Sequence, residues 1–225
     1  MKKVFLLLGI VGLLTAFSFS TNTVVKKEFE GVITYSINYI YVPPIYRGIE
    51  SDLPPIMKMF VKGEKVRMEE KMGGDGGSTI SIFDNSTKQE FFLTEIYGQK
   101  VALRFSKQQK LEMNKDIKPS EVTYYKKDRI NILGYKCKKA IVYNPNDDTS
   151  SEVYYTSALN NMSMVYKSLP GMPLEYIEYR DKLKLKMTAS SISEESISDS
   201  LFEIPKEYKI VTQKQLQKMM TKIGG

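Results

Sequence analysis

Histidine is absent from the 225 residues of this chain, and cysteine occurs once, as Cys137. Histidine is the commonest general base near neutral pH and the commonest ligand of transition metals. Its absence excludes Ser-His-Asp and Cys-His catalytic arrangements, and it would leave a zinc site with only Cys137 and carboxylates as ligands. We therefore expect no cofactor and no metal site.

Pairs of carboxylates are the remaining candidates for acid–base catalysis, and two occur as adjacent residues, Glu69-Glu70 and Glu194-Glu195. Adjacent side chains on a strand point to opposite faces, so neither pair can act on one substrate. We assign both pairs to the surface and expect that the protein is not an enzyme. The oxygen-rich segment 144–148 lacks the spaced ligands of a calcium loop, and we interpret it as a turn.

The single cysteine cannot form an internal disulfide, so the stability of the fold must come from its core. Alternation along residues 135–143 places Cys137 on the same face as Tyr135. We interpret Cys137 as a buried structural thiol, and the alternative is a reactive thiol.

The first residues have the pattern of a secretory signal peptide. Two lysines precede an apolar run over residues 4–17, and small residues follow at the spacing of a cleavage site. The run is shorter than the roughly 20 apolar residues of a membrane-spanning helix, and Cys137 is too distant to carry a lipid anchor. We expect a signal peptide over residues 1–20 and a single β-rich domain over residues 21–225, periplasmic or secreted, and at most peripheral to a membrane.

Basic residues exceed acidic ones in the sequence. Without residues 1–20 the chain keeps 31 Lys and Arg against 26 Asp and Glu, a net charge of about +5 spread along its length. Such an excess attracts anionic lipid or polysaccharide, but solvated sheet faces explain it equally well, and we favour the second interpretation. No basic block is interleaved with stacking aromatics, so no nucleic-acid partner is expected.

Apolar and polar residues alternate with a period of two along most of the chain, which indicates half-buried β-strands. In residues 30–41 the apolar side chains share one face, and Thr34, Ser36 and Asn38 lie on the other. Hairpins are predicted for residues 57–61 with 66–68, for 135–143 with 152–156, and for 174–179 with 183–189. The last strand alternates with lysines, which favours an antiparallel sheet with one solvated face.

Only two short helices are predicted. Residues 157–166 place Leu159, Met162 and Tyr166 on one side at helical spacing. At the C-terminus Thr212 can cap a helix. Its apolar stripe consists of Leu216, Met219, Met220 and Ile223. We interpret both stripes as packing surfaces, and the second is a candidate lid over the apolar face of the sheet.

Methionine is abundant, with 12 in the sequence, and several fall on predicted strands. Methionine adapts to irregular apolar ligands, but it also fills ordinary cores, so both interpretations stay open. If the apolar face is partly unfilled, we expect it to bind an apolar ligand such as a lipid or the acyl chains of a lipoprotein. The residues expected to line this ligand site are Ile37, Tyr39, Met59, Val61, Met68, Leu185 and Met187.

Four segments carry a resemblance to a known family: FEGVITY at 29–35, ILGYKCKK at 132–139, LPGMPLE at 169–175 and DSLFEIPKEY at 199–208. They resemble segments of a family of exported Bacteroidetes-type proteins of unknown function, loosely similar to the GLPGLI proteins. Such families are similar in architecture to lipoprotein carriers, in which a curved antiparallel sheet forms an open half-barrel with helices on its concave side. The resemblance implies a carrier of apolar ligands or lipoproteins, or a sensor built on the same shell, and it supplies no catalytic residues.

The expected fold is mainly β: a strongly bent antiparallel sheet, forming an open, lipoprotein-carrier-like half-barrel or a β-sandwich-like layer, with a C-terminal helix. The expected function is binding or carriage of an apolar ligand by a non-enzymatic envelope protein. The alternative is a structural or protein-interaction module with a filled core, whose exposed sheet edges recruit an envelope protein. An empty concave face would favour the carrier, and a packed face would favour the module.

Overall fold

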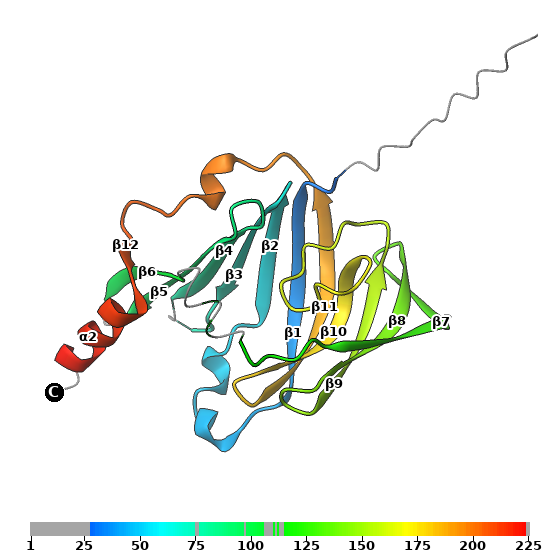
Figure 1. Ribbon diagram of the computed structural model, residues 1–225, viewed down its shortest axis with the longest axis horizontal. Helices are drawn as coiled ribbons and strands as arrows, with labels where there is room; N and C mark the ends of the chain where they lie inside the picture. Colours follow the sequence, from blue (N-terminus) through cyan, green and yellow to red (C-terminus); the bar gives the residue numbers. More distant parts are fainter. Residues whose placement is uncertain are drawn as a thin grey trace, which may run out of the picture.

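The computed structural model describes residues 28–74, 77–96, 98–105, 110, 112 and 115–223 (Figure 1). The predicted signal peptide, residues 1–20, lies outside these described residues. The described chain forms one sheet of twelve strands, in the order β12-β6-β5-β4-β3-β2-β1-β11-β10-β9-β8-β7. The strands are β1 (Gly31–Tyr41), β2 (Ile56–Lys62), β3 (Lys65–Lys71), β4 (Ser78–Asp84), β5 (Gln89–Ile96), β6 (Gln99–Arg104), β7 (Glu121–Ile132), β8 (Tyr135–Asn144), β9 (Thr149–Thr156), β10 (Met172–Arg180), β11 (Leu183–Glu194) and β12 (Lys209–Val211).

The sheet is assembled from two antiparallel meanders, β1–β6 and β7–β11, which join where β11 pairs with β1. After β11 the chain crosses to the far edge, where β12 pairs in parallel with β6. The sheet bends strongly and stays open, with β12 and β7 at its two edges (Figure 1). The prediction of a mainly β fold with a strongly bent, open antiparallel sheet and a C-terminal helix is confirmed.

Helical structure among the described residues is limited to short elements. Three 3-10 turns are η1 (Pro44–Tyr46), η2 (Glu50–Asp52) and η3 (Asp199–Phe202), and the C-terminal helix is α2 (Gln213–Ile223). Leu216 and Met219 of α2 are half-buried. The helix packs beside β6, at the edge of the sheet and away from loop 157–171 (Figure 1). The expectation that this helix forms a lid over the apolar face is therefore wrong.

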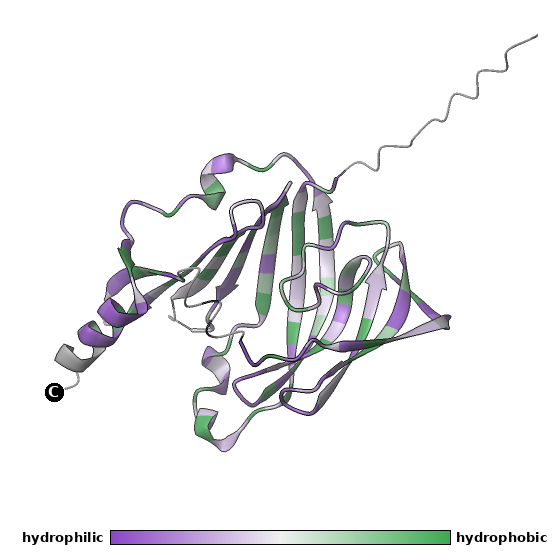
Figure 2. Ribbon diagram, viewed as in Figure 1, coloured by the Kyte–Doolittle hydropathy of each residue, from purple (hydrophilic) through white to green (hydrophobic). Residues whose placement is uncertain are grey.

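The main core lies on the inner face of the sheet, which is the face that carries Ile33, Tyr35 and Ile37 of β1. Bands of apolar and polar residues alternate along β1 and β2 (Figure 2), as the period-two pattern predicted. Loop 157–171, which joins β9 to β10, lies across this face (Figure 1). Its buried side chains are Leu159, Met162, Tyr166 and Leu169. This loop, rather than a helix, fills the face over β1, β10 and β11.

The predicted helix over residues 157–166 is wrong, because polar side chains there bind the backbone in place of helical hydrogen bonds. The Asn161 side-chain amide donates to the carbonyls of Tyr166 and Leu169, both at 2.8 Å. The Ser163 hydroxyl accepts from the backbone N–H of Tyr166 at 3.1 Å. Asn and Ser commonly compete with helices in this way, and here they hold an irregular loop with an apolar underside.

A glycine fixes the end of this loop. A side-chain carbon added at Gly171 would lie 2.0 Å from the Thr156 carbonyl oxygen, which is backbone and cannot rotate away. The close approach holds the start of β10 against the end of β9, where Met172 pairs with Thr156. The segment LPGMP at 169–173 therefore has a structural explanation within this chain.

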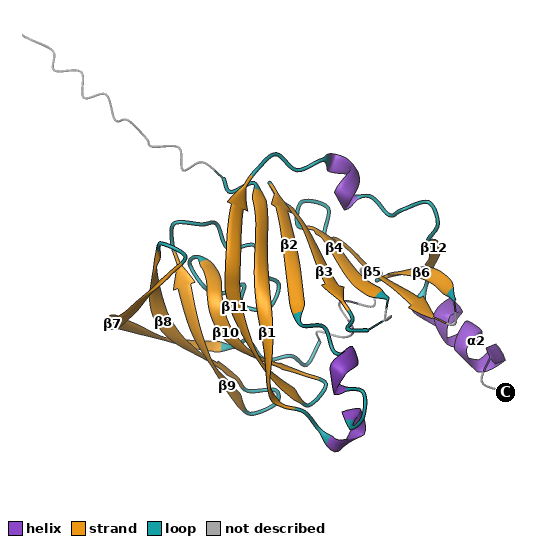
Figure 3. Ribbon diagram, turned by 180° about the vertical axis from the view of Figure 1, so that it is seen from behind, coloured by secondary structure: helices purple, strands orange, loops and turns teal. Residues whose placement is uncertain are grey.

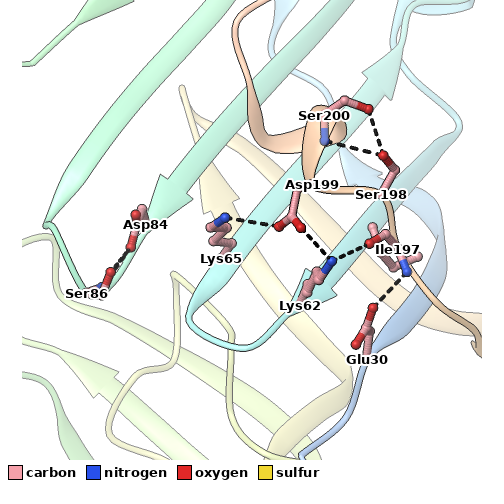
Figure 4. A network of polar contacts seen from close by, with 9 residues as sticks. All are labelled: Glu30, Lys62, Lys65, Asp84, Ser86, Ile197, Ser198, Asp199 and Ser200. Atoms are coloured by element: carbon pink, nitrogen blue, oxygen red, sulfur yellow. Dashed lines mark hydrogen bonds and ion pairs between the residues drawn. The ribbon is translucent and has the colours of Figure 1, made fainter.

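A second apolar cluster lies on the outer face, formed by Ile80, Ile82, Leu93 and Ala102. It is covered by Phe202, Ile204 and Tyr208 from the segment that crosses to β12. This crossing segment is anchored by Asp199, whose carboxylate binds Lys62 at 2.9 Å and Lys65 at 3.2 Å (Figure 4). The outer face of β1, β2 and β11 carries no covering element among the described residues (Figure 3). The predicted solvated face is thus only partly solvated.

A candidate ligand pocket on the inner face

A pocket of about 250 Å³ lies where the inner face of β2–β5 meets loop 157–171. We call it the inner-face pocket. Its lining residues are Met57, Met59, Met68, Glu70, Thr79, Ser81, Phe92, Ser163, Met164, Val165, Tyr176, Glu178 and Arg180. The pocket marks the boundary between the half of the inner face that the loop fills and the half that it leaves uncovered.

Four methionines and Phe92 form most of the apolar wall. Met57 and Met59 belong to β2 and are 3% exposed, while Met68 of β3 and Met164 of the loop are partly exposed. In the sheet, Met59 pairs with Met68 and Ser81 pairs with Phe92, so the strands place these side chains in adjacent rows. Methionine has three rotatable bonds and a polarizable sulfur, which lets such a wall adjust to different apolar shapes.

The opposite wall is charged. One guanidinium nitrogen of Arg180 lies 2.8 Å from both carboxylate oxygens of Glu70, and Arg180 also binds Glu178 at 2.9 Å. With both carboxylates ionised the three groups sum to one negative charge. Burial raises the pKa of Glu178 above its ordinary value, and the adjacent Arg180 opposes this shift. Burial also raises the pKa of Tyr39 to about 12, and the nearby negative charge of Glu70 adds to the shift.

Tyr176 lines the pocket and packs against two further tyrosine rings. Tyr176 makes edge contacts with Tyr35, with ring centroids 5.8 Å apart, and with Tyr166, at 5.3 Å. The Tyr35 hydroxyl donates to the Pro173 carbonyl at 2.8 Å, and the Tyr166 hydroxyl donates to the Ile177 carbonyl. Buried hydroxyls with partners stabilise the packing and fix the ring positions. This group of tyrosines is therefore preformed, in contrast to the adaptable methionine wall.

The seven residues predicted to line a ligand site all belong to the inner face, but they do not form one site. Met59 and Met68 line the pocket. Four others are buried in the packed core, namely Ile37, Val61, Leu185 and Met187. Tyr39 is half-buried, and its hydroxyl donates to the Pro54 carbonyl at 2.8 Å. Ligand binding by this set remains a prediction.

Sequence reasoning missed the charged wall of the pocket. Glu70 was assigned to the surface with Glu69, yet its side chain is only 15% exposed because it binds Arg180. Glu69 lies on the outer face and binds Arg67 at 2.6 Å, so the expectation that the two point to opposite faces is correct. The sequence does contain an indication of the charged wall. Glu178 falls on the apolar face of its strand, where a carboxylate needs a partner.

Among the described residues, no group of three or more Cys, Asp and Glu side chains is placed to hold a metal ion. No helix in the described ranges is long and apolar enough to cross a membrane.

No family model and no curated protein matches this sequence. Among solved structures, PNGF-II in two crystal forms aligns over 86% of this chain with TM-scores of 0.53 and 0.54 at 15% identity. A chain of the Pseudomonas aeruginosa MucA/MucB complex aligns with a TM-score of 0.42 at 10% identity, covering 83% of this chain and 59% of its own. LprF from Mycobacterium bovis has a TM-score of 0.31 at 10% identity, covering 77% and 89%.

The similarity to PNGF-II concerns only part of that protein, because the alignment covers 33% and 34% of its chain in the two crystal forms. At this sequence identity the likeness is one of fold. Membership of the exported Bacteroidetes-type family remains a prediction from the four motifs. In PNGF-II, the part that is similar in fold makes up about one third of a longer chain.

Proposed function

We propose that this protein is a non-enzymatic binding module of the cell envelope that takes an apolar group into the inner-face pocket. The observation that carries the proposal is the pocket itself, in which four methionines and Phe92 surround an unfilled volume beside the packed half of the inner face. Leaving apolar side chains without packing partners costs stability. A site of this kind is explained by a ligand that completes the packing.

The size of the pocket limits the ligand. Pockets that enclose drug-sized molecules measure roughly 300–1,000 Å³, and this one measures about 250 Å³. It fits a short apolar group, such as one end of an acyl chain or an apolar side chain of a partner protein. Enclosing a whole lipid would require loop 157–171 to leave the face.

The charged wall supports binding rather than catalysis. Glu70 and Glu178 both bind Arg180, so the polar groups satisfy one another. Paired with one another, they leave the methionine wall as the part of the pocket that contacts an apolar ligand. The sequence contains no histidine to act as a general base.

Location in the envelope is part of the proposal and depends on the signal-peptide pattern of residues 1–20. A lipid, a lipoprotein or another envelope protein is the source of an apolar group that such a module would meet.

Binding of an uncharged apolar fluorescent dye tests the proposal. Met68→Gln, a polar change at a partly exposed position in the pocket wall, should weaken dye binding about tenfold, equivalent to about 1.4 kcal/mol. Met72→Gln is the matched control, because Met72 is also half-buried but does not line the pocket. Equal dye affinity in the wild type and both variants would contradict the proposal. Native mass spectrometry of protein recovered from its own envelope should also show a co-purifying apolar mass.

A protein-interaction module is the second candidate, and an exposed apolar tip favours it. The segment between β1 and β2, with its two 3-10 turns, projects from one end of the sheet (Figure 1). Its exposed apolar residues are Ile45, which is 81% exposed, and Ile49, and the adjoining strand ends add Ile40 and Tyr41 of β1 and Ile56 of β2. Grouped exposed apolar residues often mark an interaction site. If Ile45→Asp abolished dye binding and Met68→Gln did not, the tip rather than the pocket would be the apolar binding site.

A further inference from the structure

A second cavity, of about 400 Å³, lies at the edge of the sheet that β7 forms. We call it the β7 hollow. It is lined by three tyrosines, three basic residues and Pro170, contributed by β7, β8, β9 and the end of loop 157–171. None of its lining residues belongs to the inner-face pocket, so the two sites are separate.

A bulge in β7 builds this hollow. Tyr125 pairs with Lys139 and Arg129 pairs with Lys138, so residues 126–128 of β7 have no partner in β8. Extra residues of this kind bend a strand and redirect its side chains. The bulge brings Arg129 next to Lys138 in register, immediately beyond the two tyrosines.

Two of the three tyrosines provide flat apolar surfaces that are open to solvent, and the third is buried. Tyr155 is 4% exposed, and the Tyr124 ring meets it edge-on with centroids 6.2 Å apart. Tyr124 and Tyr125 are 46% and 42% exposed. Pro170 is held beside them because its neighbour Gly171 packs directly on the Thr156 carbonyl. Large exposed rings held in place in this way are suited to stacking against a flat ligand.

The charged residues that line the hollow are all basic, while the carboxylates of Glu152 and Asp128 act on Lys139 from outside the lining. The seven lining residues include Arg129, Lys138 and Lys139 and no carboxylate. Lys139 is paired with Glu152 at 2.6 Å, and its amine lies 5.7 Å from the Tyr125 ring centroid. Arg129 and Lys138 are exposed. The hollow therefore presents a cationic side next to a flat aromatic side, which complements a ligand with negative charge and an apolar ring face.

We propose that the β7 hollow binds an acidic saccharide, with a sugar carboxylate at Arg129 and Lys138 and a ring face against Tyr124. An arginine guanidinium matches the geometry of a carboxylate, and the C–H face of a pyranose is the flat apolar surface that a tyrosine ring accepts. The bulge argues against an added peptide strand, because bulges and exposed charges are the devices that keep an edge from pairing. This inference is independent of the function proposed for the inner-face pocket.

Isothermal titration calorimetry at low salt with three probes tests the proposal: tetragalacturonate, the neutral maltotetraose and a tetraglutamate peptide. We expect tetragalacturonate to bind at least tenfold more tightly than either of the others, and its affinity to fall as salt is added. Tyr124→Ala and Arg129→Gln should each weaken it at least fivefold, while Tyr124→Phe, which keeps the ring, should retain most of the affinity. Matched controls are Tyr41→Ala and Lys58→Gln, exposed residues of β1 and β2 outside the hollow.

Unchanged affinity in the controls, with an unchanged thermal midpoint in every variant, supports the assignment. Three results would overturn it: no binding of tetragalacturonate by the wild-type protein, equal binding of tetraglutamate, or equal losses in the control variants. Equal binding of tetraglutamate would indicate an acidic-peptide site instead.

Discussion

Cys137 lies on β8 with none of its surface exposed, and its Sγ is 3.5 Å from the Tyr135 carbonyl oxygen. Burial raises the pKa of the thiol to about 11. The thiolate is the reactive form, so little of it exists near neutral pH. The interpretation of Cys137 as a buried side chain is confirmed, and its lack of reactivity remains a prediction.

A thiol-reactive dye at pH 8 should label Cys137 only after the protein is unfolded in denaturant. Cys137→Ala should lower the free energy of unfolding by about 1 kcal/mol, the usual cost of a small core change, and leave dye binding in the inner-face pocket unchanged. Labelling of the native protein at the rate of a free thiol would show that the Cys137 thiol is accessible to solvent.

Arg180 is the residue on which the charged wall depends, because it is the partner of both Glu70 and Glu178. Arg180→Met should lower the free energy of unfolding by about 2 kcal/mol at pH 7, since the buried Glu178 would lose its countercharge. Arg180→Lys keeps the charge but not the planar fork, and should cost less.

The decrease in the free energy of unfolding caused by Arg180→Met should depend on pH in a predictable direction. Burial already raises the pKa of Glu178 in the folded protein, and removal of Arg180 should raise it further. A carboxyl whose folded pKa exceeds its unfolded pKa loses stability as the pH rises through the folded value. The difference in stability between the wild type and Arg180→Met should therefore shrink as the pH falls towards 4. A difference that is constant from pH 4 to pH 8 in urea titrations would show that Glu178 is not the group responsible.

At the scale of elements, loop 157–171 takes the place that the C-terminal helix was expected to take. The alternation of residues predicted the hairpins β2–β3, β8–β9 and β10–β11 correctly, because each strand has one face in the core. The helical spacing of Leu159, Met162 and Tyr166 predicts a helix here, whereas the hydrogen bonds of Asn161 decide the conformation of the loop. Strand β7 was not predicted, since its bulge interrupts the alternation.

Gly171→Ala tests whether the loop must close against β9. The added carbon would meet the Thr156 carbonyl at 2.0 Å, so the backbone must move, and we expect a loss of about 2 kcal/mol or more. An opened loop should also increase dye binding on the inner face. Gly77→Ala is the matched control, because no atom lies within 4 Å of its added carbon. Equal thermal midpoints for the two variants would show that the loop tolerates displacement.

At the scale of the whole molecule, the inner face is divided into a filled half under the loop and a partly open half beside it. Sequence patterns could predict which residues share this face, but not which part of it is filled, because the filling loop comes from a segment with no strand or helix of its own. The candidate site was therefore predicted only in part. Its three methionines on β2 and β3 follow from alternation, whereas Met164 comes from the loop, and Glu70 and Arg180 meet only when distant strands β3 and β10 are brought to one face.

Removal of residues 213–225 should leave dye binding in the inner-face pocket unchanged within about twofold, because α2 packs beside β6 at the edge of the sheet. The thermal midpoint should fall by about 2–4 °C, the shift that about 1 kcal/mol produces in a chain of this size. A large increase in dye binding after truncation would indicate that α2 covers the inner-face pocket.

The position of β1 has a consequence for the order in which the protein folds. β1 precedes the other described strands in the sequence, yet it lies at the centre of the sheet, and one of its two partners is β11, with Gly31 opposite Glu194. The strand β6 likewise completes its pairing only with the distant β12, which ends at Val211. Pairings between such distant segments form slowly and leave strand edges exposed in the meantime. The sheet must therefore remain incompletely paired, and prone to association, until β11 and β12 have been made.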